Sequence, residues 1–400
     1  MLAVDDIRAQ FPGLSDEVAA LDGAGGTQTP QAVIDAVVDA FGDSMSNEGG
    51  AFPESRRSSE AVGGARAAIA DLVGGVPEGV VLGPSMTSLT FRIADTLSQG
   101  WGPGDEIVVS SLDHDANVSP WRLMADRAGA TTRIAELDTE TGELLAEAVE
   151  TLLTERTKLV AVTAASNAIG TRPDVRAISD AAHRVGALTY VDGVHSTPHV
   201  PTDVAALGAD FYACSSYKFC GPHTGAVIAD PALLERLRPV KLTPSTDRVP
   251  ERFERGTLQF ELLAGVEAAV DWHAGLTDAT GSRRDRVIAA LTAIEERLQE
   301  LLEQLVSGLS SIEGVRMLGA PSRRTSTVSF VVEGRAPKDV AAQLAADGIS
   351  VWDGDNYAYE LMKRFGLSES GGAVRASLVL YNTADEVDRL LAAVAALAVP

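Results

Sequence analysis

A lysine and an aspartate each follow a short apolar run that the sequence predicts as a strand. Leu188–Val191 is apolar and β-branched, and Asp192 comes directly after it. Asp210–Cys214 is the next expected strand, and the polar turn Ser215–Lys218 follows it. In an open α/β sheet, ligands bind outside the carboxyl ends of the strands. The pattern therefore predicts that Asp192 and Lys218 meet at one site.

This pair has a definite chemical meaning. A lysine amine can form a Schiff base with an aldehyde cofactor, and a carboxylate can keep a pyridine nitrogen protonated. Together they are the protein groups that let pyridoxal phosphate act as an electron sink. A surface lysine and a strand-end aspartate are also common in other α/β proteins, so the pair alone leaves both interpretations open.

Four further stretches could complete such a site. GPSMTSLT at 83–90 is a hydroxyl-rich turn that leads into a helix, where exposed amides and the helix dipole would hold a phosphate. An ordinary N-cap is the alternative. SLDHDANVSPW at 111–121 carries His114, which could stack on a cofactor ring or simply pack.

The other two stretches offer groups for a carboxylate. AASNAIGT at 164–171 places Asn167 after a strand, where its amide could bond a phenolic oxygen or a substrate carboxylate. VRASLVLYNT at 374–383 carries Arg375, and arginine is the natural bidentate partner of an α-carboxylate. A charged residue at a strand edge is the alternative for Arg375.

Length and alternation of elements set the architecture. The chain has 400 residues, which favours two domains. Strands and helices alternate from Val80 to Gly225, which indicates a mostly parallel sheet covered on both faces. Segments at 324–332, 336–347, 374–381 and 384–397 indicate a small C-terminal α+β domain. Ser44–Arg57 is polar and glycine-rich and is expected to be irregular, as a mobile segment beside a site could be.

Composition limits the partners and the compartment. The net charge of −23 argues against nucleic acid and anionic membranes, which both need a basic face. The sequence begins without a secretory pattern and contains no apolar run long enough for a membrane span. The two cysteines, Cys214 and Cys220, favour a reducing compartment and no zinc site. We therefore expect a cytoplasmic protein without a metal.

Taken in order, these motifs resemble a known family. The segments TSLT, DHDAN, SNAIGT, VDGVHSTPH, DFYACSSYKFCGP, FERGT and VRASLVLYNTADEVDRL are similar to those of class V, fold-type I pyridoxal phosphate enzymes. The nearest branch is that of the cysteine desulfurases and selenocysteine lyases. The resemblance implies a large domain at 15–275 with a seven-stranded, mostly parallel sheet. It also implies a small domain formed by 1–14 and 276–400.

The resemblance also implies roles for individual residues. Lys218 would form the Schiff base, Asp192 would pair with the pyridine nitrogen, and His114 would stack on the ring. Asn167 and His195 would lie near the phenolic oxygen, and Arg375 would bind the substrate carboxylate. The phosphate would be held by Thr87, Ser88, Ser215 and Tyr217. Thr257 would reach the phosphate of a neighbouring subunit, which implies a homodimer with shared active sites.

One position departs from the family pattern. Cysteine desulfurases carry a nucleophilic cysteine on a loop that corresponds to VWDGDNYAYELMKRFG at 351–366, and Tyr357 stands in its place. Since a phenol cannot form a persulfide, we expect a lyase that cleaves a C–S or related β-bond of an amino acid without a persulfide. An aminotransferase or epimerase of class V remains an alternative, as does a cofactor-binding sulfur-relay partner without turnover.

Overall fold

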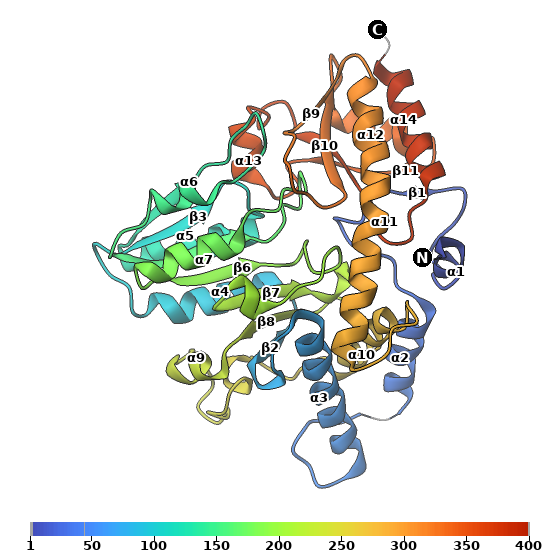
Figure 1. Cartoon of the computed structure of the whole chain (residues 1–400). Coiled ribbons are helices and arrows are strands. Elements are labelled where there is room, and N and C mark those ends of the chain that lie inside the picture. Colours follow the sequence, from blue (N-terminus) through green and yellow to red (C-terminus); the bar gives the residue numbers. More distant parts are fainter. Residues whose placement is uncertain (1–2, 44, 399–400) are drawn as a thin grey trace.

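The computed structural model describes residues 3–43 and 45–398, and a seven-stranded sheet forms its centre (Figure 1). Its strand order is β2-β8-β7-β6-β5-β3-β4. Only β8 runs antiparallel to its neighbours, so the expected mostly parallel sheet is confirmed. The strands are Val80–Gly83 (β2), Glu106–Ser110 (β3), Thr131–Ala135 (β4), Thr157–Thr163 (β5), Leu188–Asp192 (β6), Phe211–Ser215 (β7) and Gly225–Ala229 (β8).

Helices cover both faces of this sheet. Because side chains alternate between the two faces, successive residues of a strand pack into two different cores. In β8, Val227 packs with the helices on one side, while Ala226 and Ile228 pack with those on the other. The first core includes α4 (Met86–Ser98) and α5 (Ser119–Ala128). The second includes α3 (Pro53–Val73), α7 (Val175–Arg184) and α10 (Phe260–Ala274). The shorter helices are α6 (Ala146–Glu150), α8 (Val204–Leu207) and α9 (Pro231–Arg236).

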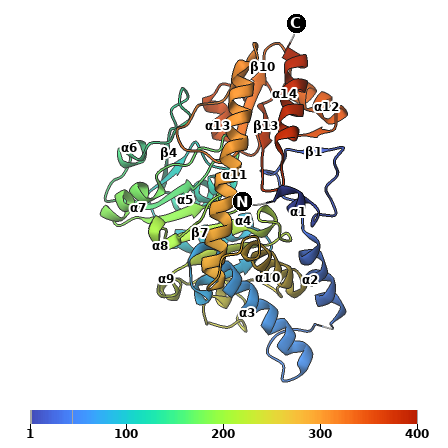
Figure 2. The ribbon, with the colours of Figure 1, turned by 45° about the vertical axis from the view of Figure 1, so that its right-hand side comes forward.

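A second sheet of four antiparallel strands forms the smaller C-terminal part. Its order is β12-β13-β10-β9, and its strands are Val315–Met317 (β9), Thr327–Val332 (β10), Trp352–Gly354 (β12) and Ala373–Ser377 (β13). The helices with it are Pro337–Ala346 (α12), Tyr359–Arg364 (α13) and Ala384–Ala398 (α14). The long helix α11 (Arg283–Ser311) contacts α3 and α10 at one end and β9 and α14 at the other (Figures 1 and 2).

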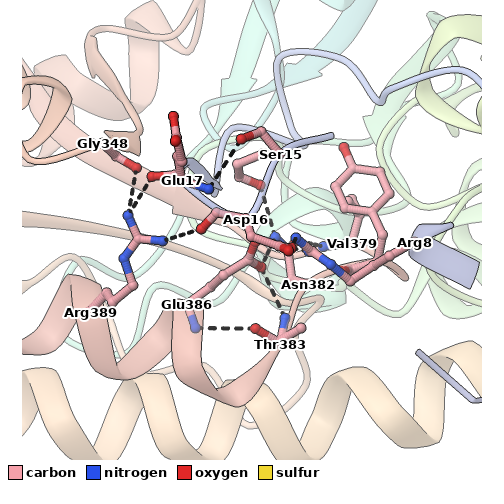
Figure 3. Close-up of polar contacts among 12 residues, drawn as sticks. Arg8, Ser15, Asp16, Glu17, Gly348, Val379, Asn382, Thr383, Glu386 and Arg389 are labelled. Carbon is pink, nitrogen blue, oxygen red and sulfur yellow. Dashed lines mark hydrogen bonds and ion pairs between the residues drawn. The ribbon is translucent and has the colours of Figure 1, made fainter. Parts of the chain in front are cut away.

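The N-terminal segment packs on the C-terminal part. It contains α1 (Val4–Arg8) and β1 (Ala19–Ala20), and β1 pairs in parallel with β11 (Ile349–Ser350). Two arginines anchor this segment (Figure 3). Arg8 pairs with Glu386 at 3.0 Å, and Arg389 donates to the carbonyl groups of Asp16, Glu17 and Gly348. The division into a large domain at 15–275 and a small domain of 1–14 and 276–400 stays a prediction.

The segment expected to be irregular is shorter than the sequence indicates. Helix α2 spans Gln31–Gly42, and α3 begins already at Pro53, so residues 53–57 are helical. The fixed φ of proline suits the first turn of a helix, and Ser55 inside that turn accepts from the Gly50 N–H at 2.7 Å. Ser44 lies outside the described residues. Among the helices of 3–43 and 45–398, none has the length and apolar character needed to cross a membrane.

Candidate active site

The carboxyl ends of four neighbouring strands surround one cavity of about 400 Å³. Asp192 ends β6 and Ser215 ends β7, while His114 and Asn167 follow β3 and β5. The smaller C-terminal part closes the opposite side with Arg375 on β13 and the segment 352–357. The structure therefore brings Asp192 and Lys218 to one cavity, as the strand pattern predicts.

Lys218 is a buried amine at the end of a single 3-10 turn, Ser216–Lys218. Its Nζ donates a hydrogen bond to the carbonyl of Ala24. Burial, followed by the charge of Arg375, lowers the pKa of Lys218 to about 7, against the opposing attraction of Asp192 and Asp22. An amine with this pKa is largely neutral above pH 7 and can act as a nucleophile or as a base.

Asp192 lies deeper, at the end of a central strand. Its Oδ1 accepts a hydrogen bond from the Val194 N–H at 2.9 Å. Burial raises the pKa of Asp192 to about 6, and the charge of Lys218 opposes that shift only in part. A carboxylate in such a place is poorly compensated by the protein alone, so a cationic ring nitrogen beside it would be strongly favoured.

His114 presents a neutral ring to the cavity. Its Nδ1 accepts from the Ala116 N–H at 3.0 Å, which leaves the proton of the neutral ring on Nε2. Burial, followed by the charges of Lys218 and Arg375, lowers the pKa of His114 to about 4. The ring stacks on that of Tyr357 with a centroid distance of 5.3 Å and an interplanar angle of 16°.

Asn167 and Arg375 connect the seven-stranded sheet to the C-terminal part at the cavity. Arg375 donates from Nη1 to the Asn167 carbonyl at 3.1 Å, and Asn167 donates from Nδ2 to the Asn356 carbonyl at 2.8 Å. Within residues 3–43 and 45–398, the buried Asn167 Oδ1 and Arg375 Nε have no hydrogen-bond partner. Burial lowers the pKa of Arg375 to about 10, so the guanidinium stays charged at neutral pH. Unpaired polar atoms of this kind suit a polar ligand.

His195 and Tyr217 also line the cavity. The Nε2 of His195 lies 3.1 Å from Thr325 Oγ1 and 3.0 Å from Thr327 Oγ1. Burial keeps the pKa of His195 well below its usual value. Tyr217 stacks on His223 at 4.7 Å, and the Lys218 Nζ lies 4.8 Å from the centre of the Tyr217 ring.

The residues predicted to hold the phosphate lie in two different pockets. Thr87 lines the cavity in the first turn of α4, together with Ser85, the N-cap residue that accepts from the Ser88 N–H at 3.1 Å. Ser88 and Thr257 line a neighbouring pocket of about 470 Å³ instead. All other predicted site residues line the first cavity, between the strand ends and the C-terminal part.

Several cavity residues were missed at the level of sequence. Ser85 could have been found as the N-cap of α4, because serine before an amphipathic helix favours that position. Gly25 carried a weaker signal, because it belongs to the glycine-rich stretch GAGG at 23–26. A Cβ at this position would lie 2.5 Å from Trp352 Nε1, which is too close for a larger residue without a shift. Trp352 and Asn356 lie in the loop 351–366 that the family resemblance indicated, but neither was predicted individually, because the contact depends on the pairing of β12 with β13.

Comparison with known proteins agrees with this geometry. The sequence profile described as Aminotransferase class-V matches residues 19–390, and the chain belongs to this family. An uncharacterised protein of Mycobacterium tuberculosis is 36% identical over 394 residues, covering 98% of each chain. A probable cysteine desulfurase of Vibrio cholerae is 33% identical over 415 residues, again covering 98% of each.

Solved structures show the same architecture. The crystal structure of the cysteine desulfurase CsdA from Escherichia coli has a TM-score of 0.85 at 28% identity, with 98% of each chain covered. Two further mycobacterial relatives are longer, and the chain spans 57% and 64% of their lengths. The fold is thus that of fold-type I enzymes in the cysteine desulfurase branch.

Pyridoxal phosphate is the cofactor of this family, and the residues present fit it. Lys218 supplies a buried amine for the aldehyde, and Asp192 a buried, only partly compensated carboxylate for the pyridine nitrogen. The first turn of α4 offers backbone N–H groups for the phosphate. Across the described part of the chain, no cluster of three or more metal-ligating side chains occurs.

The shifted pKa of Lys218 gives a direct prediction. Arg375→Met removes the second largest cause that lowers this pKa, so we expect the pKa of the Lys218 amine to rise from about 7 toward the usual value of a lysine. In cofactor-free protein, only the neutral amine reacts with an aldehyde, so the labelling rate rises with pH and levels off above the pKa. Reductive labelling of Lys218 with a small aldehyde, followed by mass spectrometry across pH, measures both midpoints.

A matched control is Arg176→Met, which removes an exposed arginine paired with Asp180 on α7. Its labelling midpoint should equal that of the unmodified protein. An unchanged midpoint in Arg375→Met would show that the arginine charge does not act on the amine.

Proposed function

We propose that the protein is a pyridoxal-phosphate-dependent lyase that cleaves the C–S or a related β-bond of an amino acid without a cysteine persulfide. The supporting observation is the position of the thiols. Cys214 and Cys220 are both buried, and burial raises the pKa of each to about 12. Neither belongs to the cavity lining of the described chain, whereas Tyr357 does. A thiol nucleophile is therefore missing where a persulfide would form.

Each step can be assigned to a residue of the cavity. The Arg375 guanidinium binds the α-carboxylate, and the unpaired Asn167 Oδ1 accepts from the ligand. Lys218 Nζ takes the proton from Cα, because its low pKa leaves a neutral amine near pH 7. Bound pyridoxal phosphate supplies an electron sink for the pair left on Cα. Asp192 keeps the pyridine nitrogen protonated.

The β-substituent then leaves with the electron pair of its bond to Cβ. The His114 Nε2–H is a neutral donor at the cavity wall and can hydrogen-bond to the departing sulfur. Water converts the remaining enamine to pyruvate and ammonia. No step needs a protein thiol, so the chemistry is complete with the residues present.

The test is a product assay on the loaded enzyme with L-cysteine and S-substituted cysteines. We expect pyruvate with sulfide or a thiol, and the Cys214→Ala and Cys220→Ala variants should keep that activity within about twofold. Alanine with sulfide would instead mean a persulfide mechanism. Racemised amino acid would indicate an epimerase, and a keto acid that keeps its β-substituent an aminotransferase. Bound cofactor without exchange of the α-proton would indicate a relay partner.

We also propose a homodimer in which Thr257 serves the partner's site. Thr257 is exposed and lines the pocket beside Ser88, outside the cavity of its own chain. Phe41 and Val38 of α2 are 68% and 60% exposed, which is typical of a surface that another subunit covers. A C2 dimer would then contain two sites, each completed by the other subunit.

Co-expression of two inactive variants tests this arrangement. Thr257→Asp should repel the phosphate, and Lys218→Ala should lack the amine. In a mixed dimer, the site that keeps Lys218 receives the intact Thr257, so about a quarter of the normal number of sites should be active after random pairing. Mixing the two variants as separately purified stable dimers is the control. If co-expression restores nothing, Thr257 acts within its own chain, and an active Thr257→Asp variant by itself would mean that Thr257 has no role.

A further inference from the structure

The segment that carries Tyr357 has an uncommon backbone. Asn356 and Tyr357 are consecutive non-glycine residues with positive φ, at 53° and 54°. The Asn356 carbonyl accepts from Asn167, and the Tyr357 carbonyl accepts from the Asp115 N–H at 2.7 Å. The Tyr357 N–H donates to Asp355 Oδ1 at 2.9 Å. With its ring stacked on His114, Tyr357 is a fixed wall of the cavity.

A further pocket of about 390 Å³ adjoins the cavity at this segment. It shares Asp355 and Tyr357 with the catalytic cavity, so the two spaces adjoin at the tyrosine. Its other walls include two exposed side chains with large apolar surfaces, Leu123 of α5 and Tyr359 of α13. Tyr357 is 72% exposed, which leaves its ring accessible. We call this space the outer pocket.

The charges around the outer pocket are unbalanced. Its lining includes the carboxylates of Asp115, Asp126 and Asp355. Arg122 is the single basic side chain in that lining among the described residues, and it already pairs with Glu360 at 2.9 Å. A negatively charged ligand group would therefore meet uncompensated repulsion there.

We propose that the outer pocket is the subsite for a large aromatic β-substituent of the amino-acid substrate, one without negative charge. This inference rests on the proposed β-lyase function. With the α-carboxylate at Arg375, the substituent extends past Tyr357 and stacks among Tyr357, Tyr359 and Leu123. The substrate class is then the arylmethyl or aryl S-conjugates of cysteine. Free cysteine would leave this subsite empty and forgo its binding energy.

The binding test uses α-methyl analogues, which have no α-proton and therefore cannot undergo elimination. We expect the S-benzyl analogue to bind the loaded enzyme about tenfold more tightly than the S-methyl analogue, and the 4-carboxybenzyl analogue to lose most of that gain. Calorimetry gives the three affinities without turnover. Equal affinities for benzyl and methyl analogues would overturn the proposal.

A charge reversal tests the position of the subsite. Asp126→Lys changes a residue that lines the outer pocket and not the catalytic cavity. It should raise the affinity for the 4-carboxybenzyl analogue about tenfold and leave that for the S-methyl analogue unchanged. Glu147→Lys, an exposed residue of α6, makes the same change in net charge and should alter neither. A selective gain in Glu147→Lys, or none in Asp126→Lys, would contradict the assignment.

The same substrates with an α-proton separate two kinds of failure. Absence of pyruvate from every conjugate would refute the lyase function, while the binding differences would remain measurable. Pyruvate formed equally well from S-methyl and S-benzyl cysteine, with equal affinities of the analogues, would refute only the subsite. Tyr359→Ala should lower kcat/KM for the benzyl substrate about tenfold and that for the methyl substrate little.

Discussion

Replacing Lys218 with alanine is expected to yield a folded protein that no longer attaches pyridoxal phosphate covalently. The amine is buried, and its pKa of about 7 leaves it reactive at neutral pH. Alanine removes both the attachment point and the base that takes the α-proton, so turnover should fall about a thousandfold or more. Borohydride reduction of the loaded protein, digestion and mass spectrometry locate the cofactor on its peptide.

Lys241→Ala is the matched control. Lys241 is a half-buried lysine that pairs with Asp247 at 3.2 Å, away from the cavity. This variant should keep the cofactor on the peptide that contains Lys218, and it should keep its activity. Cofactor that remains covalently bound in Lys218→Ala would refute the assignment of the attachment site.

The strand pattern explains why most of the site could be predicted from the sequence. Asp192 and Ser215 end neighbouring strands of the sheet, and the parallel pairing of β6 with β7 brings those ends together. Apolar runs followed by polar residues are a local signal that survives folding. His114 and Asn167 were found by the same reasoning, since they follow β3 and β5.

The residues that were missed depend on long-range contacts. β1 has two residues and pairs with β11, far away in the sequence, so neither shows a periodicity of its own. Trp352 reaches the cavity because it lies opposite Arg375 in the β12–β13 register. The positive φ of Tyr357 has no sequence signal either, because tyrosine rarely adopts it.

The early start of α3 is another feature that could not be predicted from the sequence. Residues 53–57 read as polar, and polar residues alone do not indicate a helix. Buried Ser55 and Ser58 are satisfied by backbone groups of the preceding segment, with the Ser55 Oγ donating to the Asn47 carbonyl at 2.6 Å. Hydrogen bonds of this kind make a polar helix turn acceptable in the interior, and they become visible only in the folded chain.

Asp192→Asn should reduce turnover about a thousandfold while leaving the cofactor bound. The amide keeps the shape of the side chain and can still accept from the Val194 N–H, which Asp192 binds at 2.9 Å. It cannot supply the negative charge that holds a proton on the pyridine nitrogen, so the electron sink is lost. Steady-state kinetics and the rate of α-proton exchange measure the effect. Asp355→Asn, an exposed carboxylate of the same cavity, should change either rate less than tenfold.

Although Asp192→Asn should lower turnover, it should stabilise the cofactor-free protein at high pH. Burial raises the pKa of Asp192 from 3.8 to about 6, so its ionisation disfavours the folded state, and stability falls as the pH rises from about 4 through 6. Asparagine removes that cost, and the melting temperature of Asp192→Asn should exceed that of the unmodified protein at pH 8 but not at pH 4. A lower melting temperature at pH 8, or turnover within tenfold of normal, would contradict the role given to Asp192. The carboxylate would thus cost stability in the empty site and gain its function when the pyridinium charge lies beside it.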